Sequence, residues 1–395
     1  MSIVIKDLAV ADGRLSFGVE GGPSDHLWYE VEPEYQSWFA TDRYDAAVLA
    51  ILPYAMITGK PIRVLGGVTD LLLDDLRTGI IPILNRQRPD LIPVKIDAAP
   101  VPAETRQPGS AVLMGLSCGV DSLCTLFTHL DHPVAGRRIT HFSFHDVGAH
   151  GKVNPDEVFA WRSSHAKAAA AAARRPLIVV RSNLASFRVA SFRQYHTLLN
   201  CAVGIALGAG VGTFLYSASH PYEAIQVARG GDISFADPIV LPLFSSSGVS
   251  CVSADAHLGR VEKTALIADW PYAQRWLDVC VNARADNRNC GACKKCCRTA
   301  LTLELLGKLE TFQDRFDLDR YRGARSKFIS YMLLHSEDDL VSDVLDLART
   351  RGVSLASPSM RIKAFGQRWI ERSQVALRRR FRARQRQRAM ARSSG

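Results

Sequence analysis

Short apolar runs alternate with longer runs of helical character between residues 110 and about 307, and this alternation restricts the possible folds more than any other feature of the chain. Each apolar run has the length of a buried strand, and each run between them has the length of a helix. Parallel strands need helical crossovers of this kind, which are almost always right-handed and cover both faces of the sheet. We therefore predict an α/β fold with an open parallel sheet in a three-layer sandwich. The expected strands are residues 111–116, 139–144, 177–180 and 213–217, and the expected helices are residues 122–129, 156–174 and 198–207.

The segments on either side of this region have different patterns. Residues 1–106 combine short alternating runs, typical of an antiparallel sheet, with a helical stretch, and they predict a small α+β region. The proline-containing segment 97–109 is expected to be a linker. Residues 308–360 are expected to be helical, with helical periodicity at 326–334 and 338–350. Residues 361–395 are expected to form a basic helical tail that is partly disordered. The elements expected before residue 107 are strands at 2–5, 14–19, 26–31 and 61–65, a helix over 45–58 and a helix start capped at 68–70.

The basic character of the chain lies in this tail. The formal net charge is +10, but residues 361–395 contain twelve Lys or Arg and a single acidic residue, Glu371. The tail carries +11, so the first 360 residues sum to −1. RNA could bind through the tail, with DNA or an anionic lipid surface as alternatives.

The sequence indicates neither secretion nor insertion into a membrane. Asp7 and Asp12 interrupt the N-terminal segment, where a secretion signal needs an unbroken apolar core. The uncharged stretch 197–222 is long enough to cross a bilayer, but its glycines, Asn200 and Pro221 favour a buried helix, a glycine turn and a strand. We expect no membrane association, a cytoplasmic location, reduced thiols and a protein that could form a homodimer.

A loop rich in hydroxyl groups follows the expected strand 111–116 and opens the next helix. The first amides of a helix have no internal partner, so at the carboxyl end of a parallel strand they can bind an anion. Gly119 allows close approach of a phosphate, and Asp121 could orient the loop or hold a Mg²⁺ ion that accompanies ATP. An ordinary helix start, or Cys118 as a reactive thiol, are the alternatives. The residues expected to hold the nucleotide here are Ser117, Cys118, Gly119, Val120, Asp121 and Ser122.

Four of the nine cysteines follow the spacing C-x9-C-x2-C-x2-C, at Cys280, Cys290, Cys293 and Cys296. In a reducing compartment this spacing predicts a tetrahedral structural Zn²⁺ site, with Gly291 allowing the tight turn between ligands. Cys297 is either a spare thiol or the fourth ligand. An iron–sulfur cluster, buried free thiols or a disulfide are the alternatives. Four protein ligands leave no open metal position, so we assign the site no catalytic role.

Together, the loop and the cysteine spacing resemble the PP-loop ATP pyrophosphatases, and among them the 7-cyano-7-deazaguanine synthase family of queuosine biosynthesis. The loop is similar to SGGxDS, with Cys118 in place of the second glycine. The segment Pro242-Leu243 followed by Lys263 resembles the family's late PL…K segment, and residues 278–280 resemble the segment of its first zinc cysteine. The resemblance covers residues 110–306, half of the chain.

The resemblance implies a Rossmann-like (HUP/PP-loop) domain over residues 107–307 with a zinc knuckle at 280–297. It implies an ATP-dependent ligase that uses Mg²⁺ and Zn²⁺. A carboxylate of a small-molecule acceptor would be adenylated with release of pyrophosphate and attacked by ammonia, and a second ATP could convert the amide to a nitrile. Ammonia would come from solution or from a donating partner. Asp121 and Lys263 are the expected catalytic residues, and the lysine is expected near phosphate.

Further candidates follow from their positions along the chain. His145 and Asp146, with His141 and His150, bracket the carboxyl end of the second expected strand and could contact the nucleotide or act as a base. His196 and Asn200 share one helical face, and Arg260 could assist Lys263 at the leaving pyrophosphate. Ordinary loop, helix-face and surface roles are the alternatives for all of them. The other candidates are Ser217, Ser219 and His220 after the fourth strand, and residues 229–232 as a lid.

Two other functions are compatible with the same residues. One is a tRNA-modifying PP-loop sulfurtransferase that carries a persulfide on Cys118 or Cys201 and holds RNA with the tail. The other is a non-enzymatic nucleic-acid-binding protein with a zinc knuckle and a degenerate nucleotide loop.

Overall fold

The computed structural model describes residues 2–103, 108–149, 154–187, 192–230, 232–246, 248–282, 286, 288–357 and 360. The chain divides into two compact units, Met1–Arg288 and Asn289–Gly395. The predicted basic tail, His150 and Gly231 of the predicted lid lie outside the described residues. Among the described helices, none combines the length and apolar character needed to cross a membrane.

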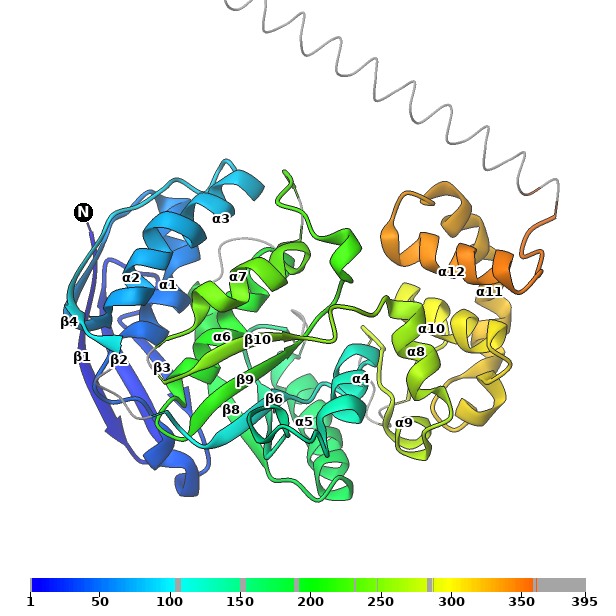
Figure 1. The fold of residues 1–395 in the computed structure, drawn as a ribbon, viewed down its shortest axis with the longest axis horizontal. Coiled ribbons are helices and arrows are strands. Elements are labelled where there is room, and N and C mark those ends of the chain that lie inside the picture. Colours follow the sequence, from blue (N-terminus) through cyan, green and yellow to red (C-terminus); the bar gives the residue numbers. More distant parts are fainter. Residues whose placement is uncertain are drawn as a thin grey trace, which may run out of the picture. The chain divides into compact units, whose positions relative to one another are not determined.

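A ten-stranded, mostly parallel sheet runs through the first unit (Figure 1). Its strand order is β10-β9-β6-β7-β8-β3-β2-β1-β4-β5. The three antiparallel pairs are β8–β3, β3–β2 and β2–β1, and the other neighbours are parallel. The strands are β1 (Ile3–Ala11), β2 (Arg14–Glu20), β3 (His26–Glu30), β4 (Ile62–Thr69), β5 (Ile96–Val101), β6 (Ala111–Gly115), β7 (His141–His145), β8 (Leu177–Ser182), β9 (Val211–Ser217) and β10 (Ser250–Ala254).

The predicted α/β alternation after residue 110 is confirmed. All four expected strands are present as β6 to β9, and the three expected helices connect them. From β6 the chain moves outward through β7 and β8, and it then returns to the other side of β6 to form β9 and β10. The connecting helices are α4 (Val120–His129), α5 (Pro155–Ala172) and α6 (His196–Ala206).

The burial of β6 explains why this strand could be predicted from the sequence. Ala111, Val112, Leu113 and Met114 are all buried, so the strand reads as a continuous apolar run instead of an alternating one. Helix α1 (Asp45–Thr58), predicted with the same bounds, is buried over most of its circumference and ends at Gly59, whose φ of 65° suits a left-handed C-cap.

Several elements differ from the predictions. The predicted linker 97–109 is wrong at its start, because β5 pairs with β4 there; a proline is tolerated in β5 because the strand lies at the edge of the sheet. The short polar strand β10 was not predicted. Thr69 precedes α2 (Asp70–Asp75), but its hydroxyl donates to Asp45 instead of capping the helix. The predicted antiparallel strands near the N-terminus join the parallel ones through β3 and β8.

Helices pack against one another in two groups in the first unit and in one group in the second. Helix α4 packs against α8, whereas α6 packs against α1 and α7. In the second unit, α10 packs against α11 and α12. The predicted helices 326–334 and 338–350 correspond to the end of α11 and to α12. The bounds are η2 (Leu76–Ile80), α3 (Ile81–Gln87), α7 (Asp237–Phe244), α8 (Arg260–Ala268), α9 (Pro271–Trp276), α10 (Lys294–Leu305), α11 (Leu318–Leu334) and α12 (Asp339–Thr350).

Candidate functional site

The loop between β6 and α4 lies at the carboxyl end of a central parallel strand. Gly119 is the N-cap of α4, and no side chain in the described part of the chain caps the first turn. The Ser122 hydroxyl donates to the Gly119 carbonyl at 3.2 Å, and the hydroxyls of Ser117 and Ser122 lie 3.2 Å apart. The first turn of α4 therefore presents uncapped amides beside two hydroxyl groups, which suits an anion.

Gly119 is not required by the internal packing of the loop. Its φ is −75°, which any residue can adopt. An added Cβ would meet the Ser117 hydroxyl and the Asp278 carbonyl oxygen at 3.5 and 3.7 Å, which are ordinary contacts. The fold itself therefore does not demand glycine here, whereas close approach of a phosphate to the backbone would favour it.

Cys118 takes a left-handed backbone conformation with a φ of 58°. The loop accepts strain here, because the left-handed region costs an L-residue about 1–2 kcal/mol. The carbonyl of Cys118 accepts the amide of Asp278 at 2.8 Å, and the residue is buried. The site uses the backbone turn at Cys118, and its thiol does not lie on the surface.

The two predicted catalytic residues, Asp121 and Lys263, lie beside each other, and Arg260 joins them. Asp121 Oδ1 lies 3.9 Å from Lys263 Nζ, and Asp121 Oδ2 lies 2.7 Å from Arg260 Nη2. Asp121 and Lys263 are 142 positions apart in the sequence, and they meet because α4 packs against α8. Two cations thus face one carboxylate at the positive end of a helix, which leaves a net positive site.

Lys263 is almost fully buried, with a 1% exposed residue surface, and donates to the Ala218 carbonyl at 2.6 Å. Burial lowers the pKa of Lys263, and the carboxylate of Asp121 partly opposes this by favouring the charged form. In the described part of the chain, the buried atoms Asp121 Oδ1 and Arg260 Nε have no hydrogen-bond partner. A water molecule or a polar ligand beside the loop would satisfy this acceptor and this donor.

His145 does not have the geometry of a general base. Its Nδ1 lies 2.9 Å from Asn200 Oδ1 and its Nε2 lies 2.7 Å from Ser143 Oγ, so both ring nitrogens bond within the protein. Burial lowers the pKa of His145 to about 4, with the Asn200 hydrogen bond opposing, so the ring is neutral at physiological pH. The side chain ties β7 to α6.

Asp146 and His141, which were predicted together with His145, lie at different ends of β7. The Asp146 amide donates to the Val180 carbonyl, and the Asp146 carbonyl accepts from Ser182 Oγ at 2.5 Å, so these contacts are made by its backbone. His141 begins β7, at the end opposite to His145, and packs against Trp38 with ring centroids 4.7 Å apart. We expected it at the carboxyl end with the others, and that placement is wrong.

The predicted lid at 229–232 is tied down by its described residues. The Gly230 amide donates to the Gln87 carbonyl at 2.9 Å. Asp232 caps the short helix η8 (Ile233–Ala236) and pairs with Arg193 at 2.9 Å. These anchors do not fit a loop that opens and closes over a nucleotide.

After β9, His220 stacks on Phe235 with ring centroids 3.7 Å apart, and Ser217 Oγ is a buried hydroxyl without a described partner.

The four predicted zinc ligands form one cluster. The Sγ atoms of Cys280, Cys290, Cys293 and Cys296 all lie within 4.8 Å of one another. Tetrahedral Zn²⁺ with bonds of about 2.3 Å places its sulfurs about 3.8 Å apart, so this spacing fits one metal ion such as zinc. Gly291 has a φ of 72°, and an added Cβ would lie 2.2 Å from the Asp317 carbonyl oxygen, which confirms its predicted turn.

Cys297 lies outside the cluster. Its thiol donates to the Gly291 carbonyl at 3.3 Å, whereas the Cys296 amide donates to Cys293 Sγ at 3.4 Å. Burial, with the neighbouring Cys293 and Cys290 thiols, raises the pKa of Cys297 to about 11. Of the two adjacent cysteines, Cys296 belongs to the metal group and Cys297 is the spare thiol.

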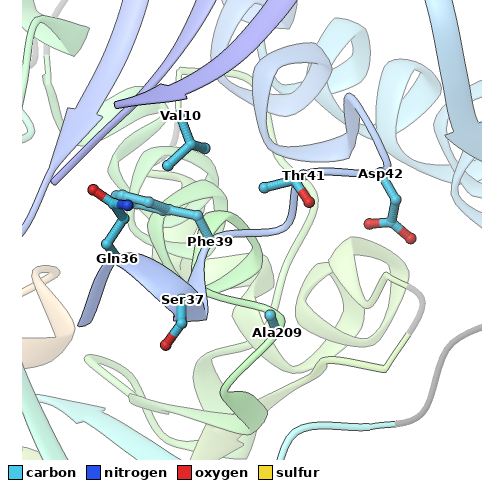
Figure 2. Close-up of a pocket in the computed structure, with 7 residues that line it drawn as sticks. All are labelled: Val10, Gln36, Ser37, Phe39, Thr41, Asp42 and Ala209. Atoms are coloured by element: carbon cyan, nitrogen blue, oxygen red, sulfur yellow. The ribbon is translucent and has the colours of Figure 1, made fainter. Parts of the chain in front are cut away.

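A separate pocket of about 560 Å³ lies away from these residues. Figure 2 shows its lining, which comes from the end of β1, from η1 (Pro33–Trp38) and the segment after it, and from Ala209 before β9. Because β6 and β9 are parallel, Ala209 marks the amino end of the sheet, opposite to the loop at 117–122. None of the predicted site residues lines this pocket. Its lining residues are Val10, Gln36, Ser37, Phe39, Thr41, Asp42 and Ala209.

Sequence reasoning missed the hydrogen-bonded group formed by Tyr216, His196 and Asp232. Tyr216 was part of an expected strand without a chemical role, and His196 was paired with Asn200 alone. A polar residue next to the carboxyl end of a strand was the only available signal.

Comparison of the chain with protein-family models, curated proteins and solved structures gives no match to any of them.

Proposed function

We propose that this chain is an ATP-dependent adenylating ligase similar to 7-cyano-7-deazaguanine synthase. It would activate a carboxylate as an adenylate, release pyrophosphate, and pass the acyl group to ammonia or another nitrogen nucleophile. The fold would be Rossmann-like, with helices on both faces of the parallel strands. The strand order supports this, because the chain reverses direction beside β6, and open α/β sheets bind ligands at such a switch point.

The arrangement of Asp121, Arg260 and Lys263 around the uncapped start of α4 carries the proposal. Two buried or half-buried cations and a helix N-terminus can bind the phosphates of ATP, and they oppose the charge that develops on departing pyrophosphate.

The chain's own residues divide the first step between them. The amides at the start of α4 and the hydroxyls of Ser117 and Ser122 would hold the phosphates. Arg260 would stabilise the leaving pyrophosphate, and Lys263 would fix Asp121 and the end of β9 in place. An acceptor oxygen would attack the α-phosphorus, and the bond from that phosphorus to the bridging oxygen would break.

The metals have separate roles in this proposal. Mg²⁺ would bind with the phosphates of ATP and neutralise their charge, and the unsatisfied Oδ1 of Asp121 could contact it. Zn²⁺ would be held by the four clustered thiolates and would stabilise the local fold.

A sulfurtransferase has less support in the geometry. Cys118 and Cys201 are both buried, and burial raises the pKa of Cys201 well above its ordinary value. A persulfide carrier needs an accessible thiol that ionises readily.

The direct test is ATP turnover by the purified full-length chain with Mg²⁺, ammonium and 7-carboxy-7-deazaguanine, the acid that corresponds to the nitrile of the resembled family. We expect pyrophosphate and AMP in equal amounts, both dependent on the acid and measurable by coupled assay and chromatography. Formation of ADP and phosphate instead would contradict adenylation.

Nucleotide binding can be tested without any acceptor. Mg·ATP at 100 times its dissociation constant should stabilise the chain by about 2.7 kcal/mol and raise its melting temperature. AMP, which lacks the two phosphates that the site would hold, should give a smaller shift. Equal shifts, or none with ATP, would remove the loop at 117–122 from the proposal.

A further inference from the structure

Three side chains form a hydrogen-bonded series beside the carboxyl end of β9. Tyr216 OH lies 2.6 Å from Nδ1 of His196, and Nε2 of the same ring lies 3.1 Å from Asp232 Oδ1. The residues come from β9, from the first turn of α6 and from the segment before η8. Packing of α6 on β9, with η8 against α6, therefore assembles a group that no local sequence pattern contains.

The direction of the hydrogen bonds follows from Asp232. Its Oδ1 accepts from the Ser234 amide and hydroxyl at 3.2 and 2.9 Å, and its Oδ2 accepts from Arg193. Burial by itself would raise the pKa of Asp232, but hydrogen bonds from His196 and Arg193 outweigh it and hold the pKa below its usual range. The carboxylate is ionised, so the proton between the two residues belongs to Nε2 of His196. In the neutral ring this tautomer leaves Nδ1 with the lone pair that accepts a hydrogen bond from the Tyr216 hydroxyl.

Tyr216 keeps its proton in this environment. Burial, followed by the nearby Asp237 carboxyl group, raises the pKa of Tyr216 well above its ordinary value. The phenol is therefore a neutral group that donates to His196 and can accept a proton from a third group. This is the arrangement of a relay in which a proton moves from Tyr216 to His196 while Asp232 balances the new charge.

The series lies at the same edge of the sheet as the loop at 117–122. Met114 of β6 pairs with Leu215 of β9, and these neighbouring strands are parallel. Tyr216 is thus one residue beyond the last paired position, at the level where β6 ends and the loop begins. Tyr216 and Ser217 are partly exposed as whole residues, and they lie at the end of β9 beside the switch point between the strands.

We propose that Tyr216, His196 and Asp232 relay a proton away from the nitrogen nucleophile in the second step of the proposed reaction, an inference that rests on the proposed function. As nitrogen forms its bond to the acyl carbon, it gives one proton to the Tyr216 oxygen, and the Tyr216 proton passes to Nδ1 of His196. The bond from the acyl carbon to the AMP oxygen breaks, and AMP leaves with the electron pair. The imidazolium formed is paired with Asp232.

The test separates the two steps in the full-length variants Tyr216→Phe and His196→Gln. Each is incubated with Mg·ATP and 7-carboxy-7-deazaguanine, with either ammonium or hydroxylamine as the nucleophile. Hydroxylamine is the less basic amine, so its nitrogen loses a proton to water more readily and depends less on the protein. We expect amide formation from ammonium to fall about 100-fold or more, as loss of general-base catalysis implies. Hydroxamate formation, and the pyrophosphate release that accompanies it with hydroxylamine, should stay within about twofold of the wild type.

Tyr29→Phe is the matched control, because Tyr29 is a buried tyrosine whose hydroxyl donates to the Ala46 carbonyl at 3.4 Å. It should change neither nucleophile's rate. An unchanged amide rate in Tyr216→Phe, or an equal fall with both nucleophiles, would overturn the relay and leave the proposed function standing. Absence of pyrophosphate release from the wild-type chain would overturn both.

Discussion

Replacing Asp121 with asparagine should lower kcat for pyrophosphate release by about 100- to 1,000-fold, the effect of removing one preorganised electrostatic group from an active site. Asparagine keeps the size of the side chain but removes the charge that holds Arg260 at 2.7 Å and faces Lys263 at 3.9 Å. The cations then lose their fixed positions. Their net charge toward ATP rises, so the KM for ATP should not increase.

Asp131→Asn is the matched control for this variant. Asp131 follows the end of α4 and pairs with Arg175 at 3.5 Å, but its side chain is 86% exposed. An exposed pair contributes little, so stability should change by less than about 0.5 kcal/mol and kcat should stay at the wild-type value. Steady-state pyrophosphate assays on both variants make the comparison. A wild-type kcat in Asp121→Asn would exclude the carboxylate from the reaction.

The part of the site that could be predicted is the part set by local rules. An apolar run followed by Ser117, Gly119 and Asp121 indicates a strand, a tight turn and a helix start, and all three are present. The pairing of Asp121 with Arg260 depends on how α8 packs on α4. From the sequence, Arg260 could lie near phosphate or on an ordinary solvated helix face, and no local pattern decides between the two.

The errors have physical causes of the same kind. His145 was offered as a base because it ends a strand, but its ring nitrogens bond to Ser143, two residues back on the same face, and to Asn200 of α6. The strand β5 contains a proline, and β10 is short and polar, so neither has an apolar pattern. Both are completed by pairing with a neighbour, at the two edges of the sheet.

Replacing Cys296 with serine should lower the zinc content of the purified chain from about one ion to well below one, and should destabilise the second unit more than any ordinary core substitution. Apparent binding free energies of structural zinc are about 10–16 kcal/mol, against about 0.5–3 kcal/mol for most single substitutions. Cys296 is fully buried, and its Sγ lies 3.9 Å from that of Cys290. A solvent molecule therefore cannot take the place of the lost thiolate ligand without rearrangement of the protein.

Cys297→Ser provides a control of unusual stringency, because the two cysteines are adjacent on α10 and equally buried. Serine at 297 can keep the hydrogen bond to the Gly291 carbonyl, so this variant should retain both its zinc and its unfolding midpoint. Metal analysis and chelator-dependent unfolding followed by circular dichroism would compare the two. If Cys297→Ser lost its zinc and Cys296→Ser kept it, Cys297 would be the fourth ligand and Cys296 the spare thiol. Iron found in the wild-type chain would show that the metal is iron and not zinc. Because a thiol one residue along a helix points about 100° away, only one of the pair can face the other three ligands.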